Sequence, residues 1–194
     1  MAALKYIREQ KDSHLLSLGV VEGEETVLYT VNAETYEAVG SPAPRCHLTE
    51  SQLSAIKYTD SLIRAKKKAL SLLAFSDNNR RTLMTKLLRA GFSREISESV
   101  VSEMVALGYV NEERQLERLI IAEAKLKLQG RRKFIPKLVA KGYERALVDS
   151  VLEKLLESGE IDFDIIAEEL VAKKLGDDPN PEAVRILLYK NGLA

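Results

Sequence analysis

Two segments, RRTLMTKLLRAGF at Arg80–Phe92 and RRKFIPKLVAKGY at Arg131–Tyr143, align without a gap and decide the fold of this chain. A third segment, PEAVRILLYKNGL at Pro181–Leu193, aligns with both of them. The copies start 51 and then 50 residues apart. Self-similarity at a fixed period is typical of repeat proteins, in which each unit buries its apolar face against its neighbours. The sequence therefore predicts a tandem repeat.

Apolar residues in each copy recur at intervals of three and four, which places them on one face of a helix. In the first two copies these residues are Leu83, Leu87 and Leu88 and, one repeat later, Phe134, Leu138 and Val139. A glycine follows each helix, at Gly91, Gly142 and Gly192, where it can adopt the left-handed conformation that ends a helix. Each copy is thus predicted to be an amphipathic helix that ends at a glycine.

The alignment of the first two copies continues beyond this glycine into a further helix. We expect it to begin near Ser93 in the first copy and near Glu144 in the second. Gly108 and Gly159 should end it, and the residues Asn111 and Asp162 are then predicted to cap the next helix. Each repeat is therefore expected to contain three helices.

Two positions qualify this pattern. Pro136 lies inside the second copy, but a helix that begins near Arg132 would place it among the first four residues, whose N–H groups have no helical partner. The third copy stops at Ala194, so it is expected to lack a third helix. Its apolar residues Ile186, Leu187 and Leu188 should then have fewer partners than their counterparts.

The first 48 residues follow a different pattern. Three short runs, at Leu4–Glu9, Leu15–Val21 and Thr26–Val31, are rich in β-branched, aromatic and leucine residues and are separated by turn-like residues at 11–13 and 22–25. They predict a small antiparallel β meander, followed by a linker at 40–44. Thr49 and Gln52 have the spacing of a capping box, which should open a helix leading to Phe75, with or without a break.

The predicted fold class is therefore mainly α: tandem three-helix repeats of about 50 residues, the third incomplete, after a small β meander. The predicted domains are residues 1–48, a β-rich segment and linker; 49–111, the first repeat with its lead-in helix; 112–162, the second repeat; and 163–194, a partial third repeat.

Composition excludes several classes of protein. Hydrophobic residues make up 45% of the 194 residues and charged residues 30%, which argues against disorder and against a membrane protein. No run approaches the roughly 20 apolar residues that span a bilayer, and the N-terminus does not resemble a signal peptide. The single cysteine, Cys46, excludes an internal disulfide and is compatible with a reducing compartment. We expect a cytoplasmic monomer.

Charge is distributed unevenly although the net charge is zero. Residues 1–60 have a net charge of −4, residues 61–145 of +10 and residues 146–194 of −6. The candidate binding residues are cations on or beside the aligned helices, namely Arg80, Arg81, Lys86, Arg89, Arg94, Arg131, Arg132, Lys133, Lys137 and Lys141. Equivalent positions in stacked repeats tend to share a face, so these cations could form one strip that binds phosphates or an acidic protein groove. The alternative is an ordinary solvated helix surface.

Nothing in the sequence indicates catalysis. The chain has no Walker loop, no GxGxxG and no nucleophile elbow. Cys46 and His47 are adjacent, so their side chains diverge, and no second cysteine could complete a zinc site. We therefore expect no catalytic residue, no metal and no cofactor.

Several of these motifs resemble those of the RecX family. The first repeat, from Phe75-Ser76 to Gly91-Phe92, is similar to that of RecX proteins, as is the join Leu107-Gly108-Tyr109-Val110-Asn111-Glu112-Glu113. Gly130-Arg131-Arg132-Lys133 resembles the opening of the family's second repeat. The sequence departs from the family at Asn111, where an acidic residue is common, and at the following residues, where a small residue and an aromatic are common.

The resemblance implies a non-enzymatic modulator, usually an inhibitor, of the RecA recombinase. Family members are thought to bind the groove of the RecA–DNA filament and to restrain ATP hydrolysis and strand exchange. This would give the chain a role in DNA repair, recombination and the SOS response, with direct DNA contact left open. The alternative is a general DNA-binding repeat module that acts by competing for DNA. An enzyme is a third and remote alternative.

Overall fold

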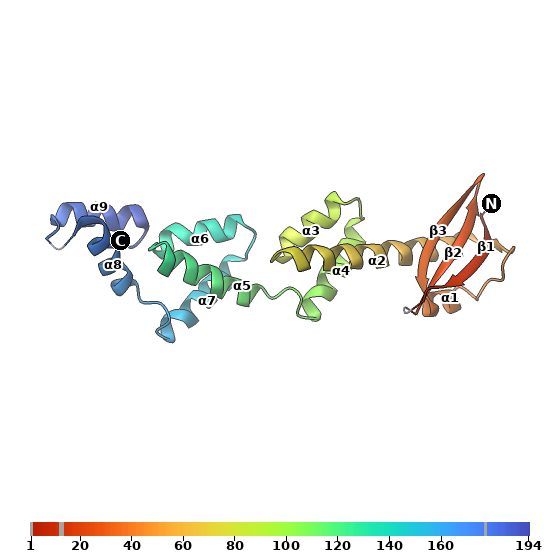
Figure 1. The fold of residues 1–194 in the computed structure, drawn as a ribbon, viewed down its shortest axis with the longest axis horizontal. Helices are drawn as coiled ribbons and strands as arrows, with labels where there is room; N and C mark the ends of the chain where they lie inside the picture. The colour runs from red at the N-terminus through yellow and green to blue at the C-terminus, as the bar shows by residue number, and fades with distance from the viewer. Residues whose placement is uncertain (1, 12–13, 177) are drawn as a thin grey trace. The chain divides into compact units, whose positions relative to one another are not determined.

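The computed structural model describes residues 2–11, 14–176 and 178–194, so the predicted turn at residues 11–13 lies partly outside them. The chain is mainly helical with a small antiparallel sheet at its N-terminus, which confirms the predicted fold class (Figure 1). It divides into two compact units. The first unit contains the residues up to 74 and 86–103, and the second contains 75–85 and 104–194. Helices α3 (Arg80–Arg89) and α4 (Arg94–Ala106) contribute residues to both units.

The sheet of the first unit confirms the predicted meander. Strands β1 (Ala2–Glu9), β2 (Leu15–Glu22) and β3 (Glu25–Asn32) pair with one another in antiparallel order. A two-residue strand, β4 (His47–Leu48), pairs with the free edge of β1 and gives the order β3-β2-β1-β4. Neither β4 nor the short helix α1 (Ala33–Ala38) was predicted, because both are too short to show a periodic pattern.

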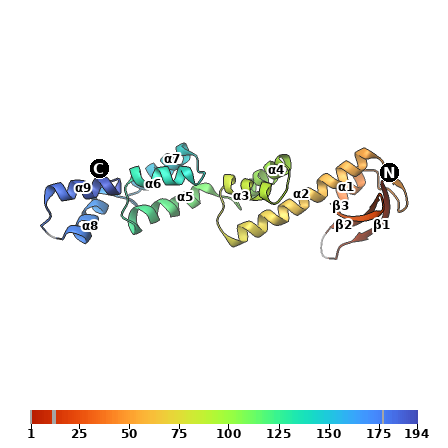
Figure 2. The ribbon, with the colours of Figure 1, turned by 90° about the horizontal axis from the view of Figure 1, so that it is seen from above.

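Helix α2 (Glu50–Phe75) covers one face of this sheet with its first turns (Figures 1 and 2). The predicted capping box is present, since the backbone N–H of Thr49 donates to Oε1 of Gln52 at 2.9 Å and the N–H of Gln52 donates to Oγ1 of Thr49 at 3.2 Å. The helix continues to Phe75 without a break. The core between sheet and helix is fully buried and consists mainly of Leu4, Leu18, Val20, Val31 and Ile56.

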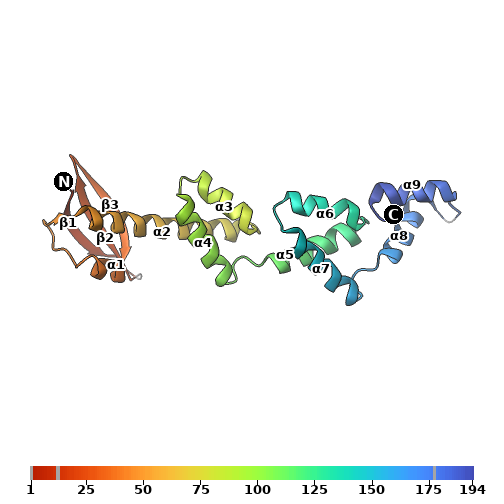
Figure 3. The same cartoon turned by 180° about the vertical axis from the view of Figure 1, so that it is seen from behind.

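The second unit contains the later helices of the repeat (Figure 3). Their order is α5 (Glu112–Ile121), a π-helical turn η1 (Ala122–Leu126), α6 (Arg131–Ala140), α7 (Arg145–Glu157), α8 (Phe163–Leu175) and α9 (Pro181–Asn191). Their buried side chains form one cluster, in which the rings of Phe134 and Phe163 stack with centroids 6.4 Å apart.

Most of the predicted helix ends are confirmed. The side chain of Asn111 accepts a hydrogen bond from the N–H of Arg114, and that of Asp162 caps α8 in the same way. Gly91 and Gly142 have φ angles of 91° and 103°, the left-handed conformation expected at both positions. The corresponding glycines at the other predicted helix ends also have positive φ.

The prediction for Pro136 was wrong. Helix α6 begins at Arg131, so the proline is its sixth residue and lies in the helix interior. At this position the missing N–H would otherwise donate to the carbonyl of Arg132, four residues earlier. The helix nevertheless continues to Ala140, because three apolar side chains of α6 are buried in the core, namely Phe134, Ile135 and Leu138.

Helix α9 differs from its two counterparts. It has no buried residue: Val184 and Leu188 are partly exposed, whereas Leu83 and Leu87, at the aligned positions of α3, are fully buried. An apolar groove lies between α8 and α9, and Val171, Val184 and Leu188 contribute to its lining. Helix α9 therefore buries less of its apolar face than α3 and α6 do. In the part of the chain that the structure describes, no helix is long and apolar enough to cross a membrane.

Candidate functional site

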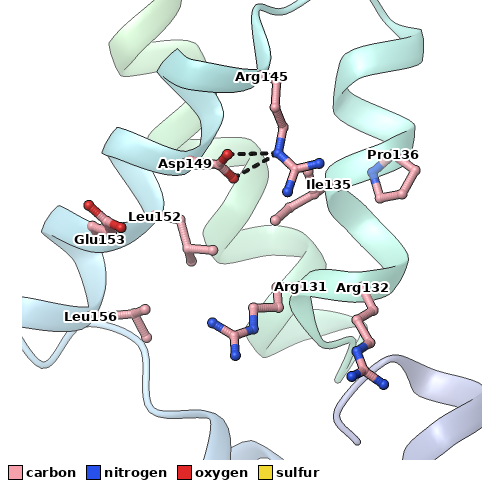
Figure 4. A pocket seen from close by; sticks show the side chains of 9 residues that line it. All are labelled: Arg131, Arg132, Ile135, Pro136, Arg145, Asp149, Leu152, Glu153 and Leu156. Atoms are coloured by element: carbon pink, nitrogen blue, oxygen red, sulfur yellow. Dashed lines mark hydrogen bonds and ion pairs between the residues drawn. The ribbon is translucent and has the colours of Figure 1, made fainter.

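A groove between α6 and α7 combines cationic and apolar side chains, and its volume is about 530 Å³ (Figure 4). Ile135 and Leu152 are buried and form its floor together with the half-buried Leu156. The other lining residues are polar or lie at the rim: Arg131, Arg132, Pro136, Arg145, Asp149 and Glu153. An apolar floor beside several guanidinium groups can bind a ligand that carries both an anionic and an apolar group.

The three arginines of this groove differ in their interaction partners. Arg145 donates from Nε to both carboxylate oxygens of Asp149, at 2.7 and 3.0 Å, so its charge is compensated. Arg132 donates from Nη1 to the backbone oxygen of Ala194 at 2.6 Å. The exposed side chain of Arg131 points into the groove and has no hydrogen bond or ion pair with any described residue (Figure 4). Arg131 is therefore the cation that a ligand can reach without breaking an existing interaction.

A second set of cations follows α6 at intervals of four residues, which places them on one side of the helix. Lys133 donates to Oδ1 of Asn191 at 3.1 Å, and Lys137 donates to Gln129 at 2.7 Å and to Glu123 at 3.2 Å. The side chain of Lys141 has no hydrogen bond or ion pair with any described residue. Together with Arg131, Lys141 gives α6 an uncompensated cation near each end.

Glu123 is a buried carboxylate in the π-helical turn. Burial alone would raise its pKa, but hydrogen bonds from Lys127 and Lys137 outweigh that effect and hold the pKa of Glu123 below its ordinary value. The carboxylate therefore stays ionised, and it holds the amino group of Lys137 at the surface of α6.

The arginines at the start of α3 have structural contacts within the second unit. Arg80 interacts with Glu112 at the start of α5, and the side chain of Arg81 packs on Gly142. A β-carbon added to Gly142 would lie 2.7 Å from Cδ of Arg81, so the contact is close. Both residues therefore help to position one repeat against the next.

The remaining predicted cations, Lys86, Arg89 and Arg94, belong to the first unit. Arg94 forms an ion pair with Glu98 at 3.5 Å, and Arg89 is exposed. The proposal that all ten predicted cations form one strip therefore remains a prediction. The predicted cations of the second unit come together at two places. One is the contact between the end of α6 and the start of α3. The other is the groove, which both Arg131 and Arg132 line.

Arg145 and Lys127 are not among the cations predicted from the sequence. The repeat offset of 51 residues would have found Arg145, because it aligns with the predicted residue Arg94, and each arginine pairs with an acid four residues later. Lys127 directly follows the π-helical turn, which no periodic pattern indicated. Among the residues described, no three side chains of His, Cys, Asp or Glu are grouped so that they could hold a metal ion.

Comparisons with known proteins point to one group of relatives. The chain is 27% identical over 172 residues to regulatory protein RecX of Caldanaerobacter subterraneus subsp. tengcongensis, a match that covers 89% of this chain and 84% of the relative. It is 30% identical over 86 residues to regulatory protein RecX of Chlorobium limicola, over 44% of this chain and 54% of the relative. No family model matches the chain.

Two solved structures have a similar fold. The crystal structure of a regulatory protein RecX superposes with a TM-score of 0.72 at 15% identity, over 98% of this chain and 92% of that chain. The crystal structure of RecX from Lactobacillus salivarius gives a TM-score of 0.58 at 15% identity, over 70% of this chain and 90% of that chain.

Proposed function

Because the chain belongs to the RecX family of regulatory proteins, we propose that it regulates the RecA recombinase by binding the RecA–DNA filament. We propose further that it acts in the cytoplasm as an inhibitor, that it catalyses no reaction, and that it binds along the filament groove. Its effects on DNA repair, recombination and the SOS response would follow from this inhibition.

The observation that carries the proposal is the pair of uncompensated cations on α6. Arg131 is the first residue of α6, Lys141 is its C-cap ten residues later, and both side chains are exposed. A helix rises 1.5 Å per residue, so these charges are spread over about 15 Å and can meet several anionic groups of an extended partner. Groups that are already exposed can bind a partner without unfolding any part of the protein.

A titration of RecA-dependent ATP hydrolysis on single-stranded DNA tests the proposal. We expect inhibition at a few protein molecules per hundred RecA molecules, because a regulator bound in a filament can affect many neighbouring subunits. Loss of ATPase activity only when the protein is abundant enough to saturate the DNA would contradict filament binding. That result would instead support a general DNA-binding module.

Charge reversal at the two exposed cations should weaken inhibition. We expect the combined variant Arg131→Glu, Lys141→Glu to need at least about tenfold more protein for the same inhibition, because two favourable contacts of about 1 kcal/mol each become repulsive. The matched control is Lys173→Glu, Lys174→Glu, which makes the same change of charge at exposed positions of α8. Equal inhibition by the two variants, both folded by circular dichroism, would remove α6 from the mechanism.

A further inference from the structure

The groove between α6 and α7 has an apolar floor beside its arginines, which a phosphate-binding surface does not require. We propose that it binds a protein segment in which a carboxylate stands next to an apolar side chain, with Arg131 as the ligand of the carboxylate. This rests on the proposed function in one respect, namely that the segment would belong to the protein part of the filament rather than to its DNA.

In the first repeat, a carboxylate of the chain itself binds the arginine that corresponds to Arg131. Arg80 aligns with Arg131 at the repeat offset, and each is the first residue of its helix. Oε1 of Glu112 accepts a hydrogen bond from the N–H of Arg80 at 2.8 Å, and its Oε2 lies 3.7 Å from Nε of Arg80. Val105 and Val110 line the same site. The site at Arg80 is thus filled by the carboxylate of Glu112, which comes two residues after the apolar Val110.

The second repeat lacks this internal ligand. The residue that aligns with Glu112 is Phe163, and its ring stacks on Phe134 in the core instead. Position 163 therefore offers no carboxylate to Arg131, whose side chain lies in the groove without a partner among the described residues (Figure 4). Leu156, which aligns with Val105, lines the same groove. The groove thus has an arginine and an apolar residue at the positions of Arg80 and Val105, but no carboxylate of the described residues pairs with that arginine.

The remaining charges favour a protein segment over DNA. Asp149 compensates Arg145, and Glu153 adds a negative charge at the rim, so the groove is only weakly cationic. A phosphodiester backbone would leave Leu152 and Leu156 without apolar contacts. A carboxylate can accept two parallel hydrogen bonds from one guanidinium group, and an adjacent apolar side chain can cover the leucines.

Nuclear magnetic resonance on the full-length chain tests this assignment. The probe is a blocked synthetic peptide, LGYVNEERQL, which corresponds to residues 107–116 of the chain itself and so carries the internal ligand. We expect titration to shift the amide signals of Arg131, Leu152 and Leu156. The peptide with both glutamates replaced by glutamine should bind at least about fivefold more weakly, because it loses the charged partner of Arg131.

Substitutions in the groove provide the second part of the test. Arg131→Ala should weaken peptide binding at least about fivefold, Arg131→Lys should weaken it less, and the control Lys174→Ala should leave it unchanged. Equal affinity for the glutamate and glutamine peptides, or unchanged binding to Arg131→Ala, would overturn the assignment. So would an oligothymidine that binds the groove more tightly than the peptide does.

The peptide titration contains no RecA, which separates the two proposals. Failure of the peptide to bind would remove the groove assignment and leave filament regulation standing. Peptide binding together with an absence of any effect on RecA would remove the proposed function and leave the groove assignment standing.

Discussion

At the scale of single residues, the same residue type in the same repeat motif has different contacts in successive copies. Arg81 and Arg132 align, but Arg81 packs on Gly142 whereas Arg132 donates to the backbone oxygen of Ala194. Arg80 and Arg131 also align, and only Arg80 has a carboxylate partner. The basic motif therefore combines residues that join repeats with residues that remain accessible to a ligand.

Glu123 should make stability depend on pH. A carboxyl group whose pKa is lowered on folding stabilises the folded state above its unfolded pKa of about 4.3, and this contribution is lost as the pH falls through its folded pKa. We expect Glu123→Gln to lower the free energy of unfolding at pH 7 by about 1 kcal/mol, allowing for the exposure of both lysine partners. At pH 3.5 the difference from the parent protein should be smaller.

Urea unfolding at the two pH values measures this difference. The control is Glu160→Gln, which removes an exposed carboxylate paired with Lys125 and should have a smaller effect at pH 7. An effect of Glu123→Gln that is equally large at pH 3.5 and at pH 7 would show that the carboxylate stabilises the turn by packing and not by its charge.

At the scale of elements, successive repeats are joined in the same way twice. The end of α6 meets the start of α3, where Nδ2 of Asn79 donates to the carbonyl of Lys141 at 3.0 Å. The end of α9 meets the start of α6, where the N–H of Gly130 donates to the carbonyl of Asn191 at 2.8 Å. A glycine loop therefore docks on the start of the preceding equivalent helix in each case.

Gly130 should be intolerant of any side chain because of this contact. Its φ of −82° suits every residue type, but an added β-carbon would lie 2.0 Å from the carbonyl oxygen of Gly192. We expect Gly130→Ala to destabilise the docking of α9 by about 2 kcal/mol, a cost typical of overpacking. Hydrogen exchange of the amides in α9 should become correspondingly faster.

Gly130→Ser is the informative companion variant. Serine is a better N-cap than glycine, so it should stabilise α6 locally, whereas its β-carbon causes the same clash as alanine. Faster exchange in α9 for both variants would establish the backbone contact as the cause. Protection of α9 at the parental level in Gly130→Ser would show that the loop can move aside at no cost.

At the scale of the whole molecule, charge is concentrated in the middle of the chain. Residues 61–145 have a net charge of +10 between two acidic regions, and they include the starts of α3 and α6. A polarised protein attracts an anionic partner and repels a cationic one, and salt weakens both effects. Recognition of the filament should therefore depend on ionic strength.

We expect the concentration of protein that halves RecA ATPase activity to rise about three- to tenfold between 50 and 200 mM NaCl. The variant with Arg131→Glu and Lys141→Glu should show a smaller rise, because fewer cations remain to be screened. RecA activity without the protein, measured at each salt concentration, is the control. A concentration for half inhibition that does not change with salt would exclude an electrostatic mode of recognition.

The sequence alone determined the local structure of this protein. Intervals of three and four residues located α3 and α6, the glycines located their ends, and the spacing of Thr49 and Gln52 located the start of α2. These features depend on residues within a few positions of one another, so they can be read along the chain.

Only the tertiary structure decided which cations are accessible. Arg80, Arg131 and Arg132 are indistinguishable as residue types, and their contacts depend on Glu112, on Phe163 and on Ala194, at separations of 32 to 62 positions. Lys137 is another example, because its amino group is bonded to Glu123, 14 positions earlier in the chain. The local sequence pattern determines which helices form. Long-range packing determines which charged side chains are already paired, because a charged group pairs with the opposite charges and polar groups that the fold brings close to it.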